Sequence, residues 1–150
     1  MSTRPRVLVI SGSARSGSLN QRLAAVAAGL AEQAGAQVTT VDLRALALPI
    51  YDADLEALGM PEGARQLRRL FAEHDALLLV SPEYNGFPTP LLINALDWVT
   101  RPAAEEGLPS GIASLTGTVA GLFSASPGAL GGLSSLLFIW EFLKMNRGML

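Results

Sequence analysis

The sequence predicts an α/β fold in which one doubly wound parallel sheet carries helices on both faces, in three α/β/α layers. Two observations predict it. Short apolar segments of strand length alternate with longer segments whose apolar residues recur at helical spacing, and glycine or proline separates them. Four such strand–helix pairs follow one another, which indicates parallel strands joined by crossover helices. Because 150 residues is the size of one domain, we expect residues 1–150 to form a single unit.

The expected strands are short and apolar. The first, Arg6–Ser11, is rich in β-branched residues and is followed by glycine, as is typical of a strand buried on both faces. The second alternates apolar and polar residues, as expected near a sheet edge. The remaining three expected strands are Gln37–Asp42, Ala76–Ser81 and Thr118–Ser124. In a doubly wound sheet of order 2-1-3-4-5, the loops after strands one and three flank the point where ligands bind.

The expected helices follow the strands in turn. We expect Ser18 to cap the first helix and Gln21 to complete a capping box, while Gly35 ends that helix. Pro61 opens the second helix at its first position, and Leu43–Met60 is expected to be irregular. The four helices are predicted over Ser18–Gly35, Pro61 to about Glu73, Pro90–Arg101 and Gly131–Asn146. The sequence ends at Leu150, where a fifth strand would begin, so we expect that strand to be missing or truncated.

Composition excludes several classes of function. The net charge of -2 gives no electrostatic reason to expect a nucleic acid or an anionic membrane as partner. The chain has no cysteine, which excludes disulfides, thiolate metal sites and thiol nucleophiles. Any redox chemistry would therefore need a bound organic cofactor. The short polar segment before Arg6 has no secretory character, so we expect a cytoplasmic protein.

Some features are assigned structural roles. The uncharged stretch Gly107–Trp140 is interrupted by a Ser-Pro-Gly turn, which favours buried elements over a membrane span. His74 is the only histidine and is expected in a solvated turn, so neither a metal site nor a Ser-His-Asp triad is predicted. We expect Glu105-Glu106 to be a surface pair. Three arginines are expected on the exposed face of the second helix: Arg65, Arg68 and Arg69.

The loop after the first strand has the composition of an anion site. Residues 11–20 are rich in glycine and serine and open directly into a helix, which offers backbone N–H groups, hydroxyls and the positive end of a helix dipole. Arg15 adds a forked donor suited to phosphate. The glycine pattern of a dinucleotide site is broken after Ser13, so a terminal phosphate monoester fits better. Asp42 keeps an alternative open, because it stands where a dinucleotide-binding sheet places its ribose-binding acid.

Two further loops lie at the same predicted edge of the sheet. Ser81–Pro88 holds two prolines and a glycine and displays an aromatic ring and an amide, Tyr84 and Asn85. Ser124–Gly128 follows the fourth strand, and its glycine permits a close approach of the backbone to a ligand. The three loops together would suit a ligand that joins a phosphate to a flat ring.

At these loops the sequence resembles a known family. The segments GSARSGSLNQRLA, SPEYNGFPTPLLINALDWVTRP and SASPGALGG resemble the flavin-site signatures of the NADPH-dependent FMN reductases, flavodoxin-like proteins that include chromate-, quinone- and azo-reducing enzymes. The resemblance implies that FMN is bound through its phosphate by the first loop and through its ring by the other two. The implied phosphate-loop residues are Ser13, Arg15, Ser18, Leu19 and Asn20, and the implied ring contacts are Pro82, Glu83, Tyr84, Asn85 and Gly86, with Ser124 and Gly128 nearby.

The resemblance also implies an activity, in which reducing equivalents pass from NADPH or NADH through bound FMN to a small acceptor. The acceptor classes left open are quinones, azo compounds, chromate, nitro compounds and free flavin, and no side chain is assigned as an obligate acid or base. Two alternatives remain at this point, a nicotinamide-only dehydrogenase and a flavodoxin-like electron carrier. The small net charge argues against the carrier, because flavodoxins are strongly acidic.

Two more expectations concern single positions and assembly. The family commonly has lysine where this chain has Ile93, so the contact made by that lysine is absent. The segment Leu133–Leu143 is apolar nearly all round, which implies burial on more than one side and therefore a homodimer or homotetramer. The helix over Pro90–Arg101, which carries Trp98, is the second candidate for contact between subunits.

Overall fold

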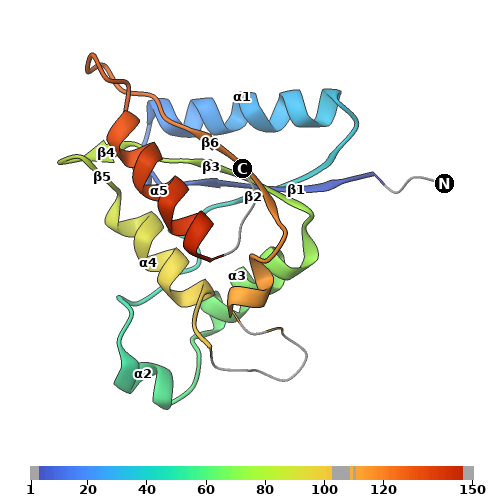
Figure 1. Ribbon diagram of the computed structural model, residues 1–150, viewed down its shortest axis with the longest axis vertical. Coiled ribbons are helices and arrows are strands. Elements are labelled where there is room, and N and C mark those ends of the chain that lie inside the picture. The colour runs from blue at the N-terminus through green and yellow to red at the C-terminus, as the bar shows by residue number, and fades with distance from the viewer. Residues whose placement is uncertain (1–3, 103–108, 110, 147–150) are drawn as a thin grey trace.

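A parallel sheet of four strands forms the middle layer of the computed structural model, which describes residues 4–102, 109 and 111–146 (Figure 1). The spatial order of the strands is β2-β1-β3-β6, and every neighbouring pair is parallel. Their bounds are Arg6–Ser11 for β1, Gln37–Val41 for β2, Ala76–Val80 for β3 and Val119–Phe123 for β6. The four predicted strands and their order are thus confirmed. The expected start of a fifth strand, at the Leu150 end of the chain, lies outside the described residues.

Four main helices cover the two faces of this sheet. The helix α1 (Leu19–Gln33) lies on one face, and α3 (Glu62–Glu73), α4 (Pro90–Val99) and α5 (Leu133–Met145) lie on the other (Figure 1). The alternation of the strands explains this division. In β1, Leu8 and Ile10 point into the core beneath α3 and α4, whereas Val7 and Val9 pack against α1. The three-layer α/β/α fold class is confirmed.

Short elements appear where the sequence predicted irregular chain. Asp52 caps the five-residue helix α2 (Ala53–Ala57), because its Oδ1 accepts the backbone N–H groups of Asp54 and Leu55 at 2.7 and 3.2 Å. A two-stranded hairpin forms from β4 (Glu83–Tyr84) and β5 (Phe87–Pro88), and a 3₁₀ turn, η1, spans Gly111–Ser114. The irregular segment before α3 is therefore partly helical.

The expectation for Arg68 was wrong. Arg68 is fully buried, and its guanidinium donates a hydrogen bond of 2.7 Å to the carbonyl oxygen of Pro109. The spacing explains the burial, since Arg68 lies on the same face of α3 as Ala64, Leu67 and Phe71. Arg69 lies on the exposed face as predicted and pairs with Glu62 at 3.7 Å. Arg65 is half-buried and pairs with the same carboxylate at 3.3 Å.

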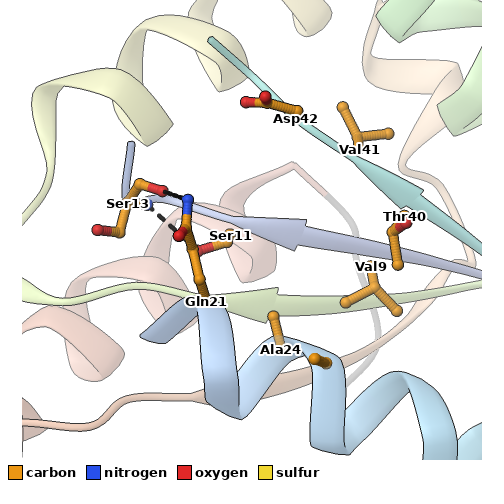
Figure 2. A pocket seen from close by; sticks show the side chains of 9 residues that line it. Val9, Ser11, Ser13, Gln21, Ala24, Thr40, Val41 and Asp42 are labelled. Carbon is orange, nitrogen blue, oxygen red and sulfur yellow. Dashed lines mark hydrogen bonds between the residues drawn. The ribbon is translucent and has the colours of Figure 1, made fainter. Parts of the chain in front are cut away.

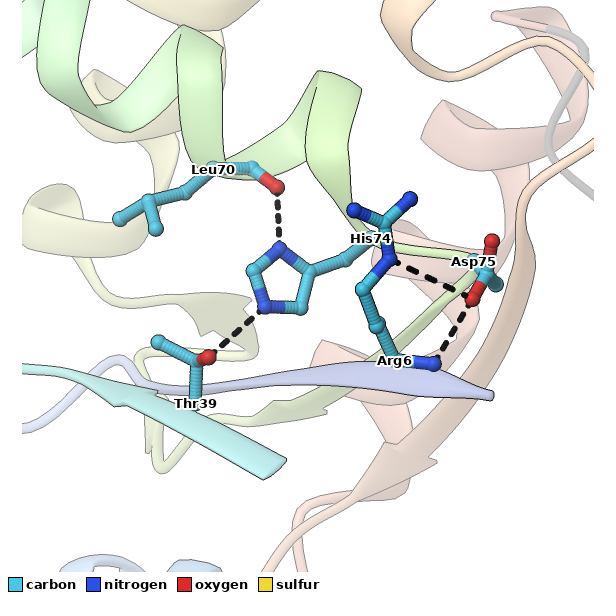
Figure 3. Close-up of polar contacts among 5 residues, drawn as sticks. All are labelled: Arg6, Thr39, Leu70, His74 and Asp75. Carbon is cyan, nitrogen blue, oxygen red and sulfur yellow. Dashed lines mark hydrogen bonds and ion pairs between the residues drawn. The ribbon is translucent and has the colours of Figure 1, made fainter. Parts of the chain in front are cut away.

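His74 is also more engaged than a solvated turn residue would be. Its Nδ1 lies 2.6 Å from the carbonyl oxygen of Leu70 in α3, and its Nε2 lies 2.8 Å from the hydroxyl of Thr39 in β2 (Figure 3). The neighbouring Asp75 accepts the backbone N–H of Arg6 at 2.7 Å. The turn between α3 and β3 is therefore fixed to both β1 and β2. Glu105 and Glu106 fall outside the described residues.

No helix in the described part of the chain combines the length and apolar character that crossing a membrane requires.

Candidate functional site

Three loops meet at the carboxyl ends of β1, β3 and β6 and enclose a pocket of about 210 Å³. Eight of the twelve residues predicted for the cofactor site line it. The full lining is Ser13, Arg15, Ser18, Leu19, Asn20, Pro82, Glu83, Tyr84, Ala125, Ser126 and Pro127. The other four predicted residues, Asn85, Gly86, Ser124 and Gly128, belong to the same loops but are not among these lining residues.

The first loop presents hydrogen-bond donors to this pocket. The Ser18 hydroxyl oxygen caps α1 by accepting the N–H groups of Asn20 and Gln21 at 3.1 and 3.4 Å, so its own proton stays available to a ligand. In the described structure, the backbone N–H groups of Arg15 and Leu19 have no protein partner. No acidic residue occupies the first turn of α1. The positive end of a 15-residue helix thus faces the pocket without a competing carboxylate of its own.

The predicted capping box forms only by half. Ser18 accepts the two backbone N–H groups, but the Gln21 side chain does not return to the backbone of Ser18. Its Nε2 instead donates to the carbonyl oxygen of Ser13 at 2.9 Å. The N–H of Ser18 donates to the carbonyl oxygen of Arg15 at 3.2 Å. Gln21 therefore fixes the shape of the loop rather than the helix end.

The start of the first loop is held from the opposite face of the sheet. The hydroxyl of Thr89, which caps α4, donates to the carbonyl oxygen of Gly12 at 2.6 Å. The N–H of Gly12 donates to the carbonyl oxygen of Val80 in β3 at 2.8 Å. A Cβ atom on Gly12 would lie 2.9 Å from the Thr89 hydroxyl oxygen and 3.1 Å from both Ser81 Oγ and Leu92 Cβ. Glycine is required here because two loops and a helix converge on this backbone.

Asn20 joins the first loop to the third. Asn20 is 3% exposed. Its Nδ2 donates to the carbonyl oxygen of Ala125 at 2.8 Å, and its Oδ1 accepts the N–H of Ala125 at 2.9 Å. Both polar ends of the amide are thereby used within the protein. Asn20 lines the pocket, as predicted, and the structure shows that it braces two of the pocket's walls.

Glu83 performs a similar task on the second loop. The N-cap position of α5 is Gly132, which has no side chain to accept a hydrogen bond. The Glu83 carboxylate reaches across from β4 and accepts the backbone N–H of Ser135 at 3.1 Å, near the positive end of that helix. This carboxylate therefore fixes α5 to the hairpin.

Asn85 and Gly86 form the tip of the hairpin. Both have positive φ, 54° and 82°, the conformation that a tight type I′ turn between two strands needs. An Asn-Gly pair between apolar residues is a strong sequence signal for such a turn, and the loop interpretation overlooked it. Whether these residues also contact a bound ring stays a prediction.

The third loop is tightly packed at its base. The hydroxyl oxygen of Ser124 is buried and has no hydrogen-bond partner among the described residues. A Cβ atom on Gly132 would collide with it, and the φ of 88° at Gly132 also favours glycine. Further along the loop, the N–H of Gly128 donates to Ser126 Oγ at 3.1 Å. The glycines here serve turn geometry and close packing.

A group of structural residues near the site escaped the sequence analysis. Asn94 in α4 donates to the carbonyl oxygen of Pro49 and accepts the N–H of Tyr51, both at 2.8 Å. Trp98 is fully buried and donates to the same Pro49 oxygen at 2.8 Å. These side chains hold the segment before α2 against α4. The Trp98 ring packs inside its own chain against Tyr51 and Met60. Contact between subunits through the helix over Pro90–Arg101 stays a prediction.

Comparison with known proteins identifies the family. Residues 5–147 match the family model described as NADPH-dependent FMN reductase. The chain belongs to this family. Similarity to individual relatives extends over most of the chain.

Among these relatives, an NAD(P)H-dependent FMN reductase from Pseudomonas aeruginosa is 37% identical over 126 residues, which cover 84% of this chain and 66% of the relative. A quinone reductase from Pseudomonas putida is 34% identical over 129 residues, 86% of this chain and 64% of the relative. The chain therefore spans just under two thirds of the length of these two relatives.

A solved structure shows the same fold. The flavoenzyme NAD(P)H:(acceptor) oxidoreductase FerB from Paracoccus denitrificans superposes with a TM-score of 0.81 at 32% sequence identity, over 97% of this chain and 74% of that one. In this chain, Ile93 lies half-buried in the first turn of α4, and its N–H donates to the carbonyl oxygen of Thr89 at 3.1 Å. Its backbone supports the α4 cap while its side chain carries no charge.

Proposed function

We propose that this chain binds FMN in the pocket between the three loops and passes reducing equivalents from NAD(P)H to a small acceptor. Residues 1–150 act in this proposal as one FMN-binding unit. The family match supports the cofactor and the class of reaction. The relatives named above include an FMN reductase and a quinone reductase, so quinones are the acceptors to test first, followed by azo compounds, chromate, nitro compounds and free flavin.

The donors of the first loop fit a phosphate dianion. Arg15 is exposed at the pocket edge and offers a forked, permanently charged donor, while Ser13 and Ser18 are nearly buried and offer hydroxyls. The free N–H groups of Arg15 and Leu19 add donors at the start of α1. A phosphate monoester accepts several such bonds at once, which matches the terminal group of FMN.

The second and third loops provide the walls for a ring. Pro82 and Tyr84 line the pocket on one side, and Ala125, Ser126 and Pro127 line it on another. Tyr84 is half exposed, and hydrogen bonds of Asn20 and Glu83, which also line the pocket, hold the two walls in place. The chemistry that FMN supplies when bound is the acceptance of a hydride from NAD(P)H and its delivery to the acceptor. The side chains position and shield; none of them is required to move a proton.

The observation that carries the proposal is the opening of α1 into the pocket beside Arg15. Replacing Arg15 with alanine should weaken FMN binding by about 1–3 kcal/mol, roughly 5- to 150-fold in Kd, since one charged hydrogen-bond partner is lost. The change is measured by quenching of FMN fluorescence on titration. Arg22→Ala is the matched control, because Arg22 is exposed on α1 and does not line the pocket.

A second experiment tests the activity. Purified protein should be yellow and should bleach when NADPH or NADH is added without oxygen, and a quinone should restore the colour. Tight binding of NADH to flavin-free protein, with no binding of FMN, would overturn the proposal. Bleaching without reoxidation by any of the named acceptors would confine the proposal to the reductive half-reaction.

Assembly and location complete the proposal. Phe87 in the hairpin and Phe138 in α5 pack edge to face with ring centroids 5.6 Å apart, and both rings are exposed. Leu133, Leu137 and Trp140 extend this apolar surface along α5. An exposed apolar surface of this kind supports a homodimer or homotetramer. The location that we propose for it is the cytoplasm. Light scattering at micromolar concentration tests the assembly, and a monomer would contradict it.

A further inference from the structure

A second cleft, of about 300 Å³, lies on the other side of the first loop, between α1 and the carboxyl ends of β1 and β2 (Figure 2). It is lined by Val9, Ser11, Ser13, Gln21, Ala24, Ala25, Thr40, Val41 and Asp42. Ser13 lines this cleft and the proposed flavin pocket alike, so the loop forms the wall between them. The volume is near the lower end of the range for ligand pockets, enough for one sugar or nucleoside.

The cleft is open because the residues of α1 that face it are small. Ala24 and Ala25 stand where larger side chains would fill the space between the helix and β2. The floor is apolar and comes from Val9 and Val41, and the polar side chains gather at the rim (Figure 2). An apolar floor with a polar rim suits a ring that has one C–H face and hydroxyls at its edge.

Asp42 is the charged group of this rim, and only one of its two carboxylate oxygens is hydrogen-bonded to the described residues. Its Oδ1 accepts the backbone N–H of Arg44 at 2.9 Å, and its other carboxylate oxygen has no partner among the described residues. Its side chain is drawn at the far end of the cleft from Ala24 (Figure 2). A carboxylate with a free oxygen is the acceptor that a pair of neighbouring hydroxyls needs.

The remaining rim groups complement the carboxylate. The Nε2 of Gln21 is committed to Ser13, which leaves its amide oxygen as an acceptor. The Ser11 hydroxyl oxygen accepts the N–H of Ser13 at 3.3 Å, which leaves its proton for donation. Acceptors thus stand on both sides of the cleft, and the Ser11 hydroxyl adds a donor beside Gln21 (Figure 2).

We propose that this cleft binds the cis-diol of a ribose, with the Asp42 carboxylate accepting hydrogen bonds from its hydroxyls. The place supports the assignment, because an acidic residue near the end of the second strand, beside a glycine-containing first loop, is how parallel α/β sheets bind ribose hydroxyls. The same carboxylate repels a 2′-phosphate, so the site selects an unphosphorylated ribose. Binding of a diol in this cleft does not depend on the proposed flavin function. Only the suggestion that the bound ribose belongs to the nicotinamide donor rests on that function.

The test uses protein as purified, with its FMN content measured by absorbance. Adenosine and 2′-deoxyadenosine are titrated while the backbone amide signals of Asp42 and Gln21 are followed by NMR. Adenosine should shift these signals and bind at least about tenfold more tightly than the deoxy compound. Asp42→Asn should weaken adenosine by a similar factor, since a charged hydrogen-bond acceptor is lost. Asparagine also accepts the N–H of Arg44, so this variant keeps the turn.

Two control variants separate the site from its surroundings. Glu32→Gln removes a carboxylate from the far end of α1 and should leave adenosine binding unchanged. Ala25→Leu fills the cleft from an exposed helix position without altering charge and should abolish binding. Equal binding of the two nucleosides, unchanged affinity in Asp42→Asn, or displacement of FMN by adenosine would each overturn the proposal.

Steady-state kinetics test whether the ribose that binds in the cleft belongs to the nicotinamide donor. If the donor occupies the cleft, kcat/KM should favour NADH over NADPH, and Asp42→Asn should lower the value for NADH and narrow that preference. If Asp42→Asn loses adenosine binding but keeps its NADH kinetics, the cleft serves a free nucleoside or nucleotide. Both results support a diol site, and FMN retention, measured separately, reports on the flavin proposal.

Discussion

The two faces of the sheet are covered to very different extents. Beneath α3, α4 and α5 the core residues are sealed, and Phe71, Leu79 and Leu96 are at most 1% exposed. On the other face α1 is the one helix among the described residues (Figure 1), and its Val26 and Leu30 are 58% and 60% exposed. An apolar hollow of about 310 Å³ lies beside α1, with Leu78 and Phe123 of the sheet among its lining residues.

This difference separates two tasks. The sealed face fixes the site, since Thr89 at the start of α4 holds Gly12, and Glu83 is bonded to α5. The α1 face supplies the helix end and the donors that line the candidate pocket. We infer that stability depends mainly on the sealed face, and that α1 tolerates substitution on its exposed side.

The largest expected effect comes from opening the sealed face. Phe71→Ala should lower the free energy of unfolding by about 3–5 kcal/mol, because it leaves a cavity in a closely packed core. Leu30→Ala removes an apolar side chain from α1 and should cost less than about 1 kcal/mol, since most of that side chain is already in water. Urea denaturation followed by circular dichroism measures both. Similar losses in the two variants would contradict the comparison.

A glycine pair compares the faces at backbone level. Gly12→Ala should destabilise the protein by about 1–3 kcal/mol, because the new methyl group meets Thr89, Ser81 and Leu92 at 2.9–3.1 Å. Gly29→Ala in α1 meets no atom within 4 Å and should stabilise the protein by about 0.5–1 kcal/mol through helix propensity. Thermal unfolding of the two variants should therefore shift in opposite directions. A loss of stability in Gly29→Ala would show that α1 is more closely packed than described.

The smallest effect is expected on the exposed side of α1. Val26→Glu should change the free energy of unfolding by no more than about 0.5 kcal/mol, as for most surface positions. The measurement is again denaturation, combined with sedimentation velocity. A loss above about 2 kcal/mol, or a change in sedimentation coefficient, would show that this face is covered in solution and would limit the comparison to the isolated chain.

The sequence predicted much of the fold, because local patterns determine much of it. Apolar runs and helical periodicity located the four strands and four main helices, and the alternation of elements predicted a parallel sheet with helices on both faces. Arg68 was misplaced, because a charge on a helix is ordinarily solvated, and its burial depends on a carbonyl of Pro109 some 41 positions away. The hairpin was missed although Asn85-Gly86 carries a recognisable turn signal.

The site was predicted in outline and missed in its internal connections. The resemblance to the family implied twelve cofactor-site residues, and eight of them line one pocket. The same reasoning assigned Asn20 and Glu83 to a ligand, whereas their polar atoms also serve Ala125 and Ser135. An amide or a carboxylate suits either partner, and only the tertiary arrangement decides which partner is within reach.

The bond between Asn20 and Ala125 has a consequence for the order of folding. It joins residues 105 positions apart, so the wall that it closes cannot form before β6 is in place. A growing chain that has reached only α4 carries the first loop and the hairpin but lacks the third loop. Because contacts between distant residues form late and at a large entropic cost, firm retention of a ligand becomes possible only near the end of folding. The time course of FMN uptake would then report on the final step of folding.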